Sequence, residues 1–524
     1  MIARGRGRSS QFSEIKISEF SEKIFSVIIH LIMKIFLKKI VVYLITLEAK
    51  YILQKFQPLI IAITGNLGKT STKEAIYAVL KNNLVDAEGE SLVQASKKSF
   101  NSEFGVPLSI LNLSSGYSNF FSWIKIIFLG LNKCFTEKYF QYLILEIGAD
   151  MPGDIQNIVE YIKPDIVVLT AFAEVPVHVE NFQNDREKLI REKKYLLEAL
   201  KSGGLLMYNS DDRDSEKMVA EISAKKNIIL KSYSLKNHQS DILATNIQIL
   251  RSDNIPTGML AKIRLAKLQN KEFEKEKEQE KEKTKEKGEA NLFETGKENT
   301  FDLKIQGSLG ESVILSTLPA ILIGQYFNLD LQKIILALEN LKLPNGRMKI
   351  LDGMNNTIII DDSYNASPKA VEHGIQTIQN INLKEIAKKI FVLGDMLELG
   401  EYTRAEHLRI GQLAGQNCQI LITAGIRARL FAEGALDAGL SEKNIFQTDN
   451  SILAGKELLQ ILEELKEERF QAGLSEEEIK KIRDLIYIKG SQGARMEKIT
   501  KMILAENHDS NLDLVRQDDF WKGK

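Results

Sequence analysis

The fold is decided by the stretch Leu59-Ile-Ile-Ala-Ile-Thr-Gly-Asn-Leu-Gly-Lys-Thr-Ser-Thr-Lys73. An apolar run typical of a buried strand leads into a turn with two glycines, and helical spacing of apolar residues follows the turn. In such a turn the backbone N–H groups and the positive end of the helix cradle phosphate oxygens, a lysine reaches the terminal phosphates, and a threonine hydroxyl binds Mg²⁺. We therefore predict a site for a nucleoside triphosphate formed by Thr64, Gly65, Asn66, Leu67, Gly68, Lys69, Thr70 and Ser71.

The predicted loop is shorter than the common G-x-x-x-x-G-K-[ST] pattern. Ile63 stands where that pattern has its first glycine, five residues before Gly68. The alternative is an ordinary glycine-rich turn between a strand and a helix. Such a turn does not require both glycines together with Lys69 and Thr70, so the phosphate loop is the better interpretation.

Composition limits the possible classes of protein. A chain of 524 residues is long enough for about two to four domains that each bury a core. The formal net charge is zero, from 70 basic and 70 acidic residues, and therefore indicates no nucleic-acid partner. Cys134 and Cys418 are too few for a disulfide framework or a cysteine metal cluster, which favours a cytoplasmic location.

Residues 1–58 read as a basic tail followed by an apolar amphipathic helix. Lys34, Lys38 and Lys39 divide the apolar run of residues 24–47 into pieces too short to cross a bilayer. Two interpretations stay open for residues 20–50: peripheral contact with the inner face of the membrane, or packing against the first sheet. For the aromatic-rich residues 120–135, a core position is favoured over a second membrane patch.

Alternating apolar runs and helical patterns predict an α/β fold with two domains. The first domain spans residues 59–344, with buried strands at 142–147, 165–170 and 204–208 and helices within 311–343. Residues 266–299 form a charged low-complexity insertion, for which we expect no chemistry. The second domain spans residues 345–508, with strands at 357–361, 390–393, 420–423 and 485–488, and residues 509–524 form a tail.

Three polar residues of the first domain are candidates for chemistry, and each has a simpler interpretation. Glu146 ends a predicted strand and is either a Mg²⁺ ligand or a solvated carboxylate. His178 follows the strand near residues 166–169, where a lone histidine is usually a polar surface residue. Lys193 lies in a helical pattern, in which lysine usually faces solvent.

The order of motifs resembles the Mur ligases. The motifs are the loop at residues 64–70, Asn101-Ser-Glu-Phe-Gly-Val-Pro-Leu108, Leu145-Glu-Ile-Gly-Ala-Asp-Met-Pro-Gly-Asp154, His178, the helix with Lys193, Asn209-Ser-Asp-Asp212, Gly346-Arg-Met348, Asp361-Asp-Ser-Tyr-Asn-Ala-Ser-Pro368, Gly394-Asp-Met-Leu-Glu-Leu-Gly400 and Lys489-Gly-Ser491. The resemblance covers residues 59–505 outside the insertion. It is specific, because motifs from two domains occur in the family's order.

The resemblance implies a central P-loop ATPase domain of Mur ligase type and a Rossmann-like C-terminal domain that close over the substrates. It also implies amide formation between a muramoyl-tripeptide donor and D-alanyl-D-alanine, with ATP consumed. The donor carboxylate attacks the γ-phosphate, and the amine of the dipeptide then displaces phosphate from the acyl phosphate. Such a reaction depends mainly on alignment and charge neutralisation.

The resemblance also assigns roles to individual residues. Lys69, His178 and Lys193 are the implied catalytic residues; Thr70 and Glu146 hold one Mg²⁺, and His178 and a carbamoylated Lys193 hold a second. Arg347 is implied to reach the γ-phosphate and Asp362 the ribose. The implied substrate-binding residues are Asn101, Asn365, Asp395, Glu398, Lys489 and Ser491.

The sequence departs from the family pattern in two places. A His-Asn-x-x-Asn stretch that usually lies close to adenine corresponds here to residues 312–316, which carry none of those amides, so we expect adenine to be recognised differently. The usual N-terminal domain for the uridine nucleotide has no counterpart in residues 1–58. Three interpretations stay open: the donor is held in another way, it is supplied as a lipid-linked precursor at the membrane, or it is another peptide.

Two alternative functions follow from these departures. One is a Mur-like amide ligase with another acceptor, such as a polyglutamate or folate-type ligase, although the motifs at residues 361–366 and 394–400 argue against it. The other is a noncatalytic nucleotide-binding scaffold. Retention of Lys69, Glu146, His178 and Lys193 argues against the scaffold.

Overall fold

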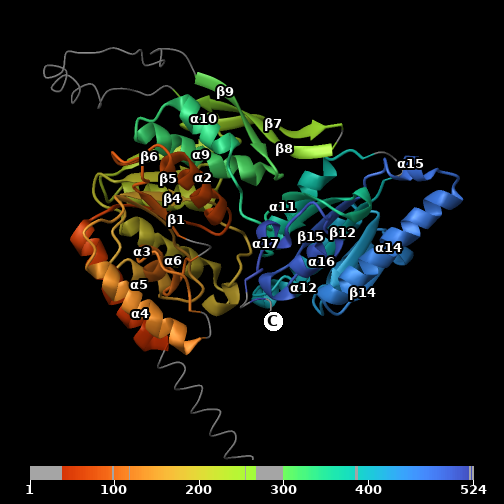
Figure 1. The fold of residues 1–524 in the computed structure, drawn as a ribbon, viewed down its shortest axis with the longest axis horizontal. Coiled ribbons are helices and arrows are strands. Elements are labelled where there is room, and N and C mark those ends of the chain that lie inside the picture. The colour runs from red at the N-terminus through yellow and green to blue at the C-terminus, as the bar shows by residue number, and fades with distance from the viewer. Residues whose placement is uncertain are drawn as a thin grey trace, which may run out of the picture.

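Two sheets covered by helices form the protein (Figure 1). The computed structural model describes residues 38–96, 100–116, 119–253, 255–266, 299–383, 387–518 and 521. Within these residues the first sheet has nine strands in the order β2-β3-β1-β4-β5-β6-β7-β8-β9. Its strands are β1 (Leu59–Thr64), β2 (Val93–Ala95), β3 (Tyr142–Glu146), β4 (Ile166–Leu169), β5 (Leu205–Asn209), β6 (Ile229–Ser234), β7 (Ile242–Ser252), β8 (Ile255–Leu265) and β9 (Asn299–Gln306).

The first sheet is parallel from β2 through β7 and antiparallel from β7 to β9. Because side chains alternate along β1, Ile61 and Ile63 enter one core and Ile60 and Ala62 enter the other. Helices α2 (Lys69–Lys81), α9 (Glu311–Tyr326) and α10 (Leu331–Glu339) contribute to the first core. The opposite core takes residues from helical residues 38–56, α3 (Gly105–Ile110), α4 (Phe120–Cys134), α5 (Asp154–Ile158), α6 (Arg186–Glu198) and α7 (Arg213–Ser223).

The second sheet has six strands in the order β10-β11-β15-β12-β13-β14, and only β10 is antiparallel to its neighbour within the described residues. The strands are β10 (Lys349–Asp352), β11 (Ile358–Asp362), β12 (Lys389–Gly394), β13 (Ile420–Ala424), β14 (Ile445–Thr448) and β15 (Leu485–Lys489). Its helices are α11 (Pro368–Gln379), α12 (Thr403–Gly415), α13 (Arg429–Asp437), α14 (Ser451–Gln471), α15 (Glu476–Ile479), α16 (Glu497–Ile503) and α17 (Ser510–Asp513). Short 3₁₀ helices are η1 (Val179–Phe182), η2 (Met354–Asn356), η3 (Gly400–Tyr402), η4 (Glu442–Asn444) and η5 (Gln492–Ala494).

The predicted α/β class with two sheets is confirmed, and every strand predicted from an apolar run is present with ends shifted by a residue or two. β8 and β9, which flank the charged insertion, pair with each other in an antiparallel register. The insertion predicted at residues 266–299 lies almost wholly outside the described residues.

The aromatic-rich segment at residues 120–135 is helix α4, and the core position expected for it is right for one face only. Ile126 and Cys134 are buried. Phe128 and Phe135, in contrast, are 67% and 74% exposed. The buried face of α4 packs against helical residues 38–56 and the end of α3, near Glu48 and Leu111, and the opposite face stays in contact with solvent.

Residues 38–56 are helical and pack on the first domain, while the earlier part of the predicted amphipathic segment lies outside the described residues. Ile45, Ala49 and Ile52 are completely buried. Lys55 Nζ donates to the carbonyls of Cys134 (3.0 Å) and Thr136 (2.7 Å), which joins this helix to the end of α4. No helix among the described residues is long and apolar enough to cross a membrane.

Candidate active site

A cavity of about 1110 Å³ lies between the two sheets. The carboxyl ends of β1, β3 and β4 open into it from one side, and residues that follow β11 and β15 line the other. Ligands of parallel sheets bind at these ends because the loops and helix N-termini converge there. The predicted phosphate loop, Glu146, His178, Lys193 and Arg347 all line this cavity.

The loop between β1 and α2 has a backbone that requires glycine. Gly65 has φ +137°, and a Cβ atom there would collide with Thr170 Oγ1. The Asn66 N–H donates to the Ala171 carbonyl (2.8 Å), and Thr170 Oγ1 donates to the Thr64 carbonyl (3.0 Å). The loop is thus held against the end of β4, with the N-terminus of α2 at the cavity.

Lys69 and Thr70 of the loop lie next to Glu146 and to Arg347 of the second domain. Lys69 Nζ donates to the Gly65 carbonyl (3.0 Å), and its burial lowers its pKa although Glu146 opposes this effect. Thr70 Oγ1 donates to Glu146 Oε2 (3.0 Å) and accepts from Arg347 Nη2 (3.1 Å). Asn101 Nδ2 donates to Glu146 Oε1 (3.3 Å), so Asn101 orients this carboxylate.

Lys193 is a buried residue of α6 and not part of a solvated helix face. Its side chain is only 2% exposed, and burial, reinforced by the charge of Lys69, lowers its pKa to about 7. The next residue, Lys194, instead pairs with Glu221 at the surface (2.6 Å). A lysine held near its neutral form beside a phosphate loop is a candidate for covalent modification.

His178 meets the second domain across the cavity. Its Nδ1 lies 2.9 Å from Glu398 Oε2, and its Nε2 lies 3.3 Å from Asp150 Oδ1. The hydrogen bond from His178 lowers the pKa of Glu398. Both His178 (φ +71°) and Glu398 (φ +63°) have left-handed backbones, which non-glycine residues adopt uncommonly.

The oxygen atoms next to the loop suit Mg²⁺ bound to a nucleotide. The described residues contain no group of three or more His, Cys, Asp or Glu side chains that could hold a metal ion by themselves. Mg²⁺ in nucleotide sites uses one or two protein oxygens and completes its shell with phosphate and water, so Thr70 and Glu146 fit one ion. His178 and Lys193 fit a second ion only if the Lys193 amine gains oxygen atoms.

Asp362 and Lys489, predicted for the ribose and the dipeptide, form a buried ion pair with each other. Asp362 Oδ1 also accepts from the Met348 N–H (3.3 Å), and Tyr487 Oη donates to Oδ2 (3.3 Å). Burial raises the pKa of Asp362, while Lys489 acts in the opposite direction. Both residues line the cavity.

The residues predicted for the dipeptide divide into two groups. Asn365, Glu398 and Ser491 line the cavity beside Lys489. Asp395 instead faces away from it, since its Oδ1 accepts from the Ala428 N–H (2.7 Å) next to α13. The Asp395 carbonyl accepts from the Ser491 N–H (2.9 Å), so Asp395 supports this wall through its backbone.

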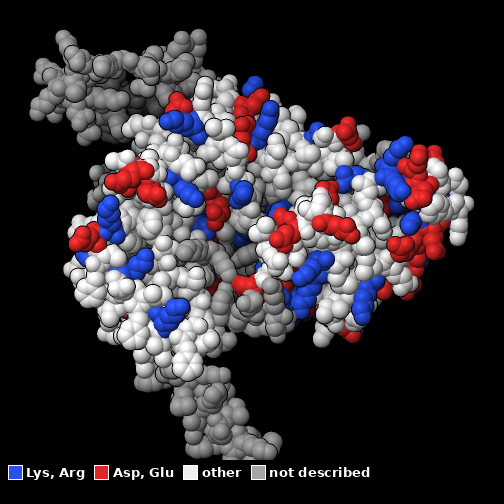
Figure 2. Space-filling view, in the orientation of Figure 1, with Lys and Arg blue, Asp and Glu red and all other residues white. Residues whose placement is uncertain are grey.

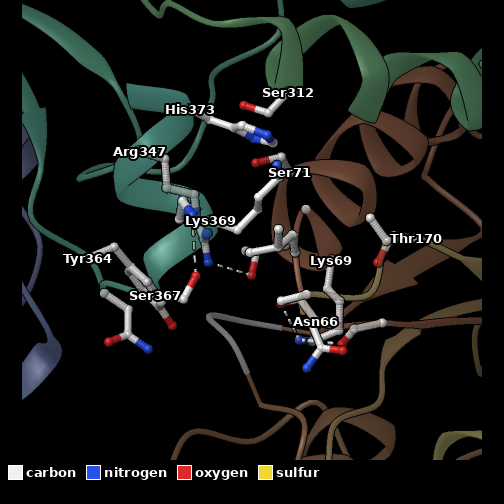
Figure 3. Close-up of a pocket in the computed structure, with 18 of the residues that line it drawn as sticks. Asn66, Lys69, Ser71, Thr170, Ser312, Arg347, Tyr364, Ser367, Lys369 and His373 are labelled. Carbon is white, nitrogen blue, oxygen red and sulfur yellow. Dashed lines mark hydrogen bonds between the residues drawn. The ribbon is translucent and has the colours of Figure 1, made fainter. Parts of the chain in front are cut away.

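The sequence-based reasoning missed the polar face of α11. His373, Gln376 and Thr377 line the cavity opposite Ser312 at the start of α9, and in Figure 3 the His373 ring lies toward Ser312 and Ser71. A Cβ atom on Gly310 would lie 3.3 Å from Thr377 Oγ1, which shows how close the two helices are. Burial lowers the pKa of His373, which favours the neutral imidazole. The sequence did contain a signal for this polar face, namely the polar residues at helical spacing after Pro368.

Comparisons with known proteins agree with this geometry. The family model for the Mur ligase middle domain matches residues 63–274, and the model for the Mur ligase glutamate ligase domain matches residues 346–492. The UDP-N-acetylmuramoyl-tripeptide–D-alanyl-D-alanine ligase of Bacillus subtilis is 25% identical over 458 residues, covering 87% of this chain and 78% of the relative. The ligase of the same name from Escherichia coli is 24% identical, covering 70% of this chain and 64% of the relative.

Two solved structures share the fold. MurF from Acinetobacter baumannii matches with a TM-score of 0.63 at 19% identity, covering 87% of this chain and 79% of that protein. MurF from Thermotoga maritima in complex with ADP matches with a TM-score of 0.61 at 20% identity, covering 88% of this chain and 83% of that protein.

Proposed function

The chain belongs to the Mur ligase family, and we propose that it is an ATP-dependent peptide ligase that adds D-alanyl-D-alanine to a muramoyl-tripeptide precursor of peptidoglycan. The observation that carries the proposal is the contact of Thr70 with both Glu146 and Arg347 beside Lys69. A phosphate loop, an acidic residue and a cation from the second domain thereby converge on one point. Phosphoryl transfer needs this convergence of charges more than it needs a nucleophilic side chain.

The reaction begins when a carboxylate oxygen of the donor attacks the γ-phosphorus of ATP and the bond to ADP breaks. The amine of the acceptor dipeptide then attacks the acyl carbon, phosphate leaves, and the amine loses a proton. Lys69 and Arg347 neutralise charge on the transferring group from opposite domains, and Asn101 keeps Glu146 directed at Thr70. Mg²⁺, when bound at Thr70 and Glu146, supplies further neutralisation of the phosphates.

We further propose that Lys193 is carbamoylated and holds a second Mg²⁺ together with His178. The neutral amine attacks the carbon of CO₂ and loses a proton, which converts a nitrogen base into a pair of oxygen ligands. Burial of Lys193 and its pKa of about 7 support this step, because only the uncharged amine reacts. For the acceptor we propose Asn365, Glu398, Lys489 and Ser491 as the binding residues, with Asp395 acting through Ser491.

We also propose the division into domains at residues 344 and 345. Residues 59–344 then hold the phosphate loop, residues 345–508 hold the acceptor side, and residues 509–524 form the tail.

The function is tested by ATP-dependent phosphate release with UDP-N-acetylmuramoyl-tripeptide, with and without D-alanyl-D-alanine, and by the mass of the product. We expect a pentapeptide product only when all three substrates are present. If the dipeptide has no effect while L-glutamate stimulates release, the alternative acceptor class is correct. If neither acceptor stimulates release with a UDP-linked or a lipid-linked donor, the protein is not a ligase and the scaffold interpretation replaces it.

The exposed face of α4 supports a second proposal, peripheral contact with an anionic membrane. Phe121, Phe128 and Phe135 are each more than 65% exposed, and Tyr43 and Tyr51 of the adjoining helix are at least half exposed. The surface over α4, at the lower left of Figure 2, is mostly uncharged with scattered basic residues. Apolar side chains rimmed by lysines, such as Lys125 and Lys133, suit the surface of a bilayer with anionic headgroups.

Membrane contact is tested by cosedimentation of the full chain with vesicles of phosphatidylcholine, with or without phosphatidylglycerol. We expect binding to anionic vesicles that is lost in the variant Phe128→Ser/Phe135→Ser. The matched control is Ile426→Ser, which removes a residue that is 78% exposed on the second domain. Equal binding by both variants and the unmodified protein would contradict the proposal. Such an enzyme would work in the cytoplasm at the inner face of the membrane.

A further inference from the structure

The tail after residue 508 returns to the link between the two sheets. α17 lies where the two lobes meet (Figure 1). Lys349 Nζ pairs with Asp513 Oδ1 (2.8 Å), and Asn345 Nδ2 donates to the Leu512 carbonyl (2.7 Å). The tail therefore contacts both ends of the segment 345–349. This segment links the two sheets and contains Arg347.

Arg516, three residues after α17, is the buried anchor of this tail. Its side chain is 6% exposed and pairs with the still more buried Glu497, which is 1% exposed (Nη1 to Oε2, 2.9 Å). The same guanidinium donates to the Ser363 carbonyl (3.1 Å) and to the Tyr364 carbonyl. An arginine suits this position because its planar fork satisfies several acceptors at once. Arg516 thereby fixes the backbone of the motif that follows β11.

Tyr364 connects Arg516 to the phosphate loop. Its ring centroid lies 4.2 Å from the Arg347 guanidinium and 5.8 Å from that of Arg516. Arg347 in turn donates to Thr70 Oγ1 (3.1 Å), whereas Arg347 Nε is buried and has no hydrogen-bond partner among the described residues. The direction of the Arg347 guanidinium therefore depends on the Tyr364 ring and on Thr70.

We propose that Arg516 is a positioning residue for phosphoryl transfer: it fixes Tyr364, and Tyr364 holds Arg347 against the phosphate loop. The inference rests on the proposed function for the role of Arg347 at the γ-phosphate. The tail also reaches the cavity wall, since Arg495 Nη2 donates to the Trp521 carbonyl (3.2 Å) and Trp521 lines the cavity. The described part of the tail thus extends from the segment 345–349 to the wall of the cavity.

The test compares the affinities of a non-hydrolysable ATP analogue and of ADP, each with Mg²⁺, for the full chain and for Arg516→Met. Methionine fills the space without the charge, and Glu497 keeps its second partner, Arg495 (2.5 Å). Because Arg347 acts at the γ-phosphate, we expect the analogue to bind about tenfold more weakly and ADP to change by less than about twofold. Arg516→Lys, which retains the pairing with Glu497, should recover part of the loss.

Three further variants separate positioning from a general structural role. Tyr364→Leu should reproduce the selective loss, and the double variant Tyr364→Leu/Arg516→Met should be no worse than either single variant, because both act through one path. Arg404→Met, which removes an arginine paired with Glu433 at the surface, should change neither affinity.

The outcomes distinguish this inference from the proposed function. Equal weakening of both nucleotides by Arg516→Met, multiplicative effects in the double variant, or an unmodified protein that does not prefer the triphosphate would each overturn the inference. If Arg516→Met does not fold, Tyr364→Leu alone decides, because it leaves the Arg516 pairing intact. If the protein does not catalyse ligation but Arg516→Met still weakens binding of the ATP analogue selectively, the proposed function is refuted. The role of the tail at the triphosphate then stands.

Discussion

Removal of the Lys193 amine tests the chemistry of the site most directly. An ordinary lysine has a pKa of about 10.4, so at pH 7 roughly one molecule in 2500 carries the neutral amine that reacts with CO₂. The pKa of about 7 for Lys193 makes the neutral amine about half of the population. Burial thus raises the concentration of the reactive species roughly a thousandfold. The charged form gains as the pH falls below 7, so the carbamate and the activity should decline there.

The assay is acceptor-dependent phosphate release by Lys193→Ala in buffer from which CO₂ has been removed, followed by addition of bicarbonate or a short carboxylic acid. We expect loss of activity in the variant and partial recovery with the carboxylic acid, which supplies the missing oxygen ligands. The unmodified protein should lose activity without CO₂ and regain it with bicarbonate. With ¹³C-bicarbonate it should show a carbamate carbon signal that Lys193→Ala lacks.

The matched control is Lys194→Ala, because Lys194 is the neighbouring lysine and pairs with Glu221 at the surface. In every buffer it should behave as the unmodified protein does, losing activity without CO₂ and regaining it with bicarbonate. Carbamoylation of Lys193 is refuted if Lys193→Ala is rescued under no condition and the unmodified protein shows no carbamate signal. It is equally refuted if Lys193→Ala keeps its full activity, because the second Mg²⁺ site would then not need this residue.

Three other predictions concern the loop, the adenine side and the insertion. Lys69→Ala should abolish phosphate release while the melting temperature changes by only a few degrees, because it removes a cation at the phosphates; release above background would contradict its role. His373→Ala should raise the KM for ATP about tenfold without changing the KM for the dipeptide, since His373 lines the cavity opposite Ser312; an unchanged KM for ATP would exclude α11 from nucleotide recognition. Deletion of residues 271–289 should leave kcat within about twofold, because that run buries little apolar surface; a larger loss would show that the insertion takes part in the reaction.

Features that depend on neighbouring residues in the chain were predictable from the sequence. The phosphate loop, the strands and the helix after Pro368 each follow from a local pattern of apolar residues, glycines and caps. Gly65 illustrates the reason: its φ of +137° and the closeness of the Thr170 side chain leave no room for a Cβ atom, and the residue type reveals the turn. The position of Glu146 at the end of a buried strand was predictable, whereas its role as a Mg²⁺ ligand was implied only by the family resemblance.

Features that depend on tertiary contacts were not predictable from local patterns. Lys193 and Lys194 look alike in the sequence, but one is 2% exposed and the other pairs with Glu221 at the surface. Asp395 lies in a motif that suggests substrate contact, yet its carboxylate is used at the start of α13. The two faces of α4 differ because only one of them packs against helical residues 38–56 and the end of α3. Periodicity gives a helix but not the depth at which each residue lies.

The remaining parts of the site arise only where the two domains meet. Arg347 reaches Thr70 across 277 positions of the chain, and His178 and Glu398 meet from opposite domains, each with a left-handed backbone. Because these partners come from different domains, no local pattern in the chain predicts that they meet.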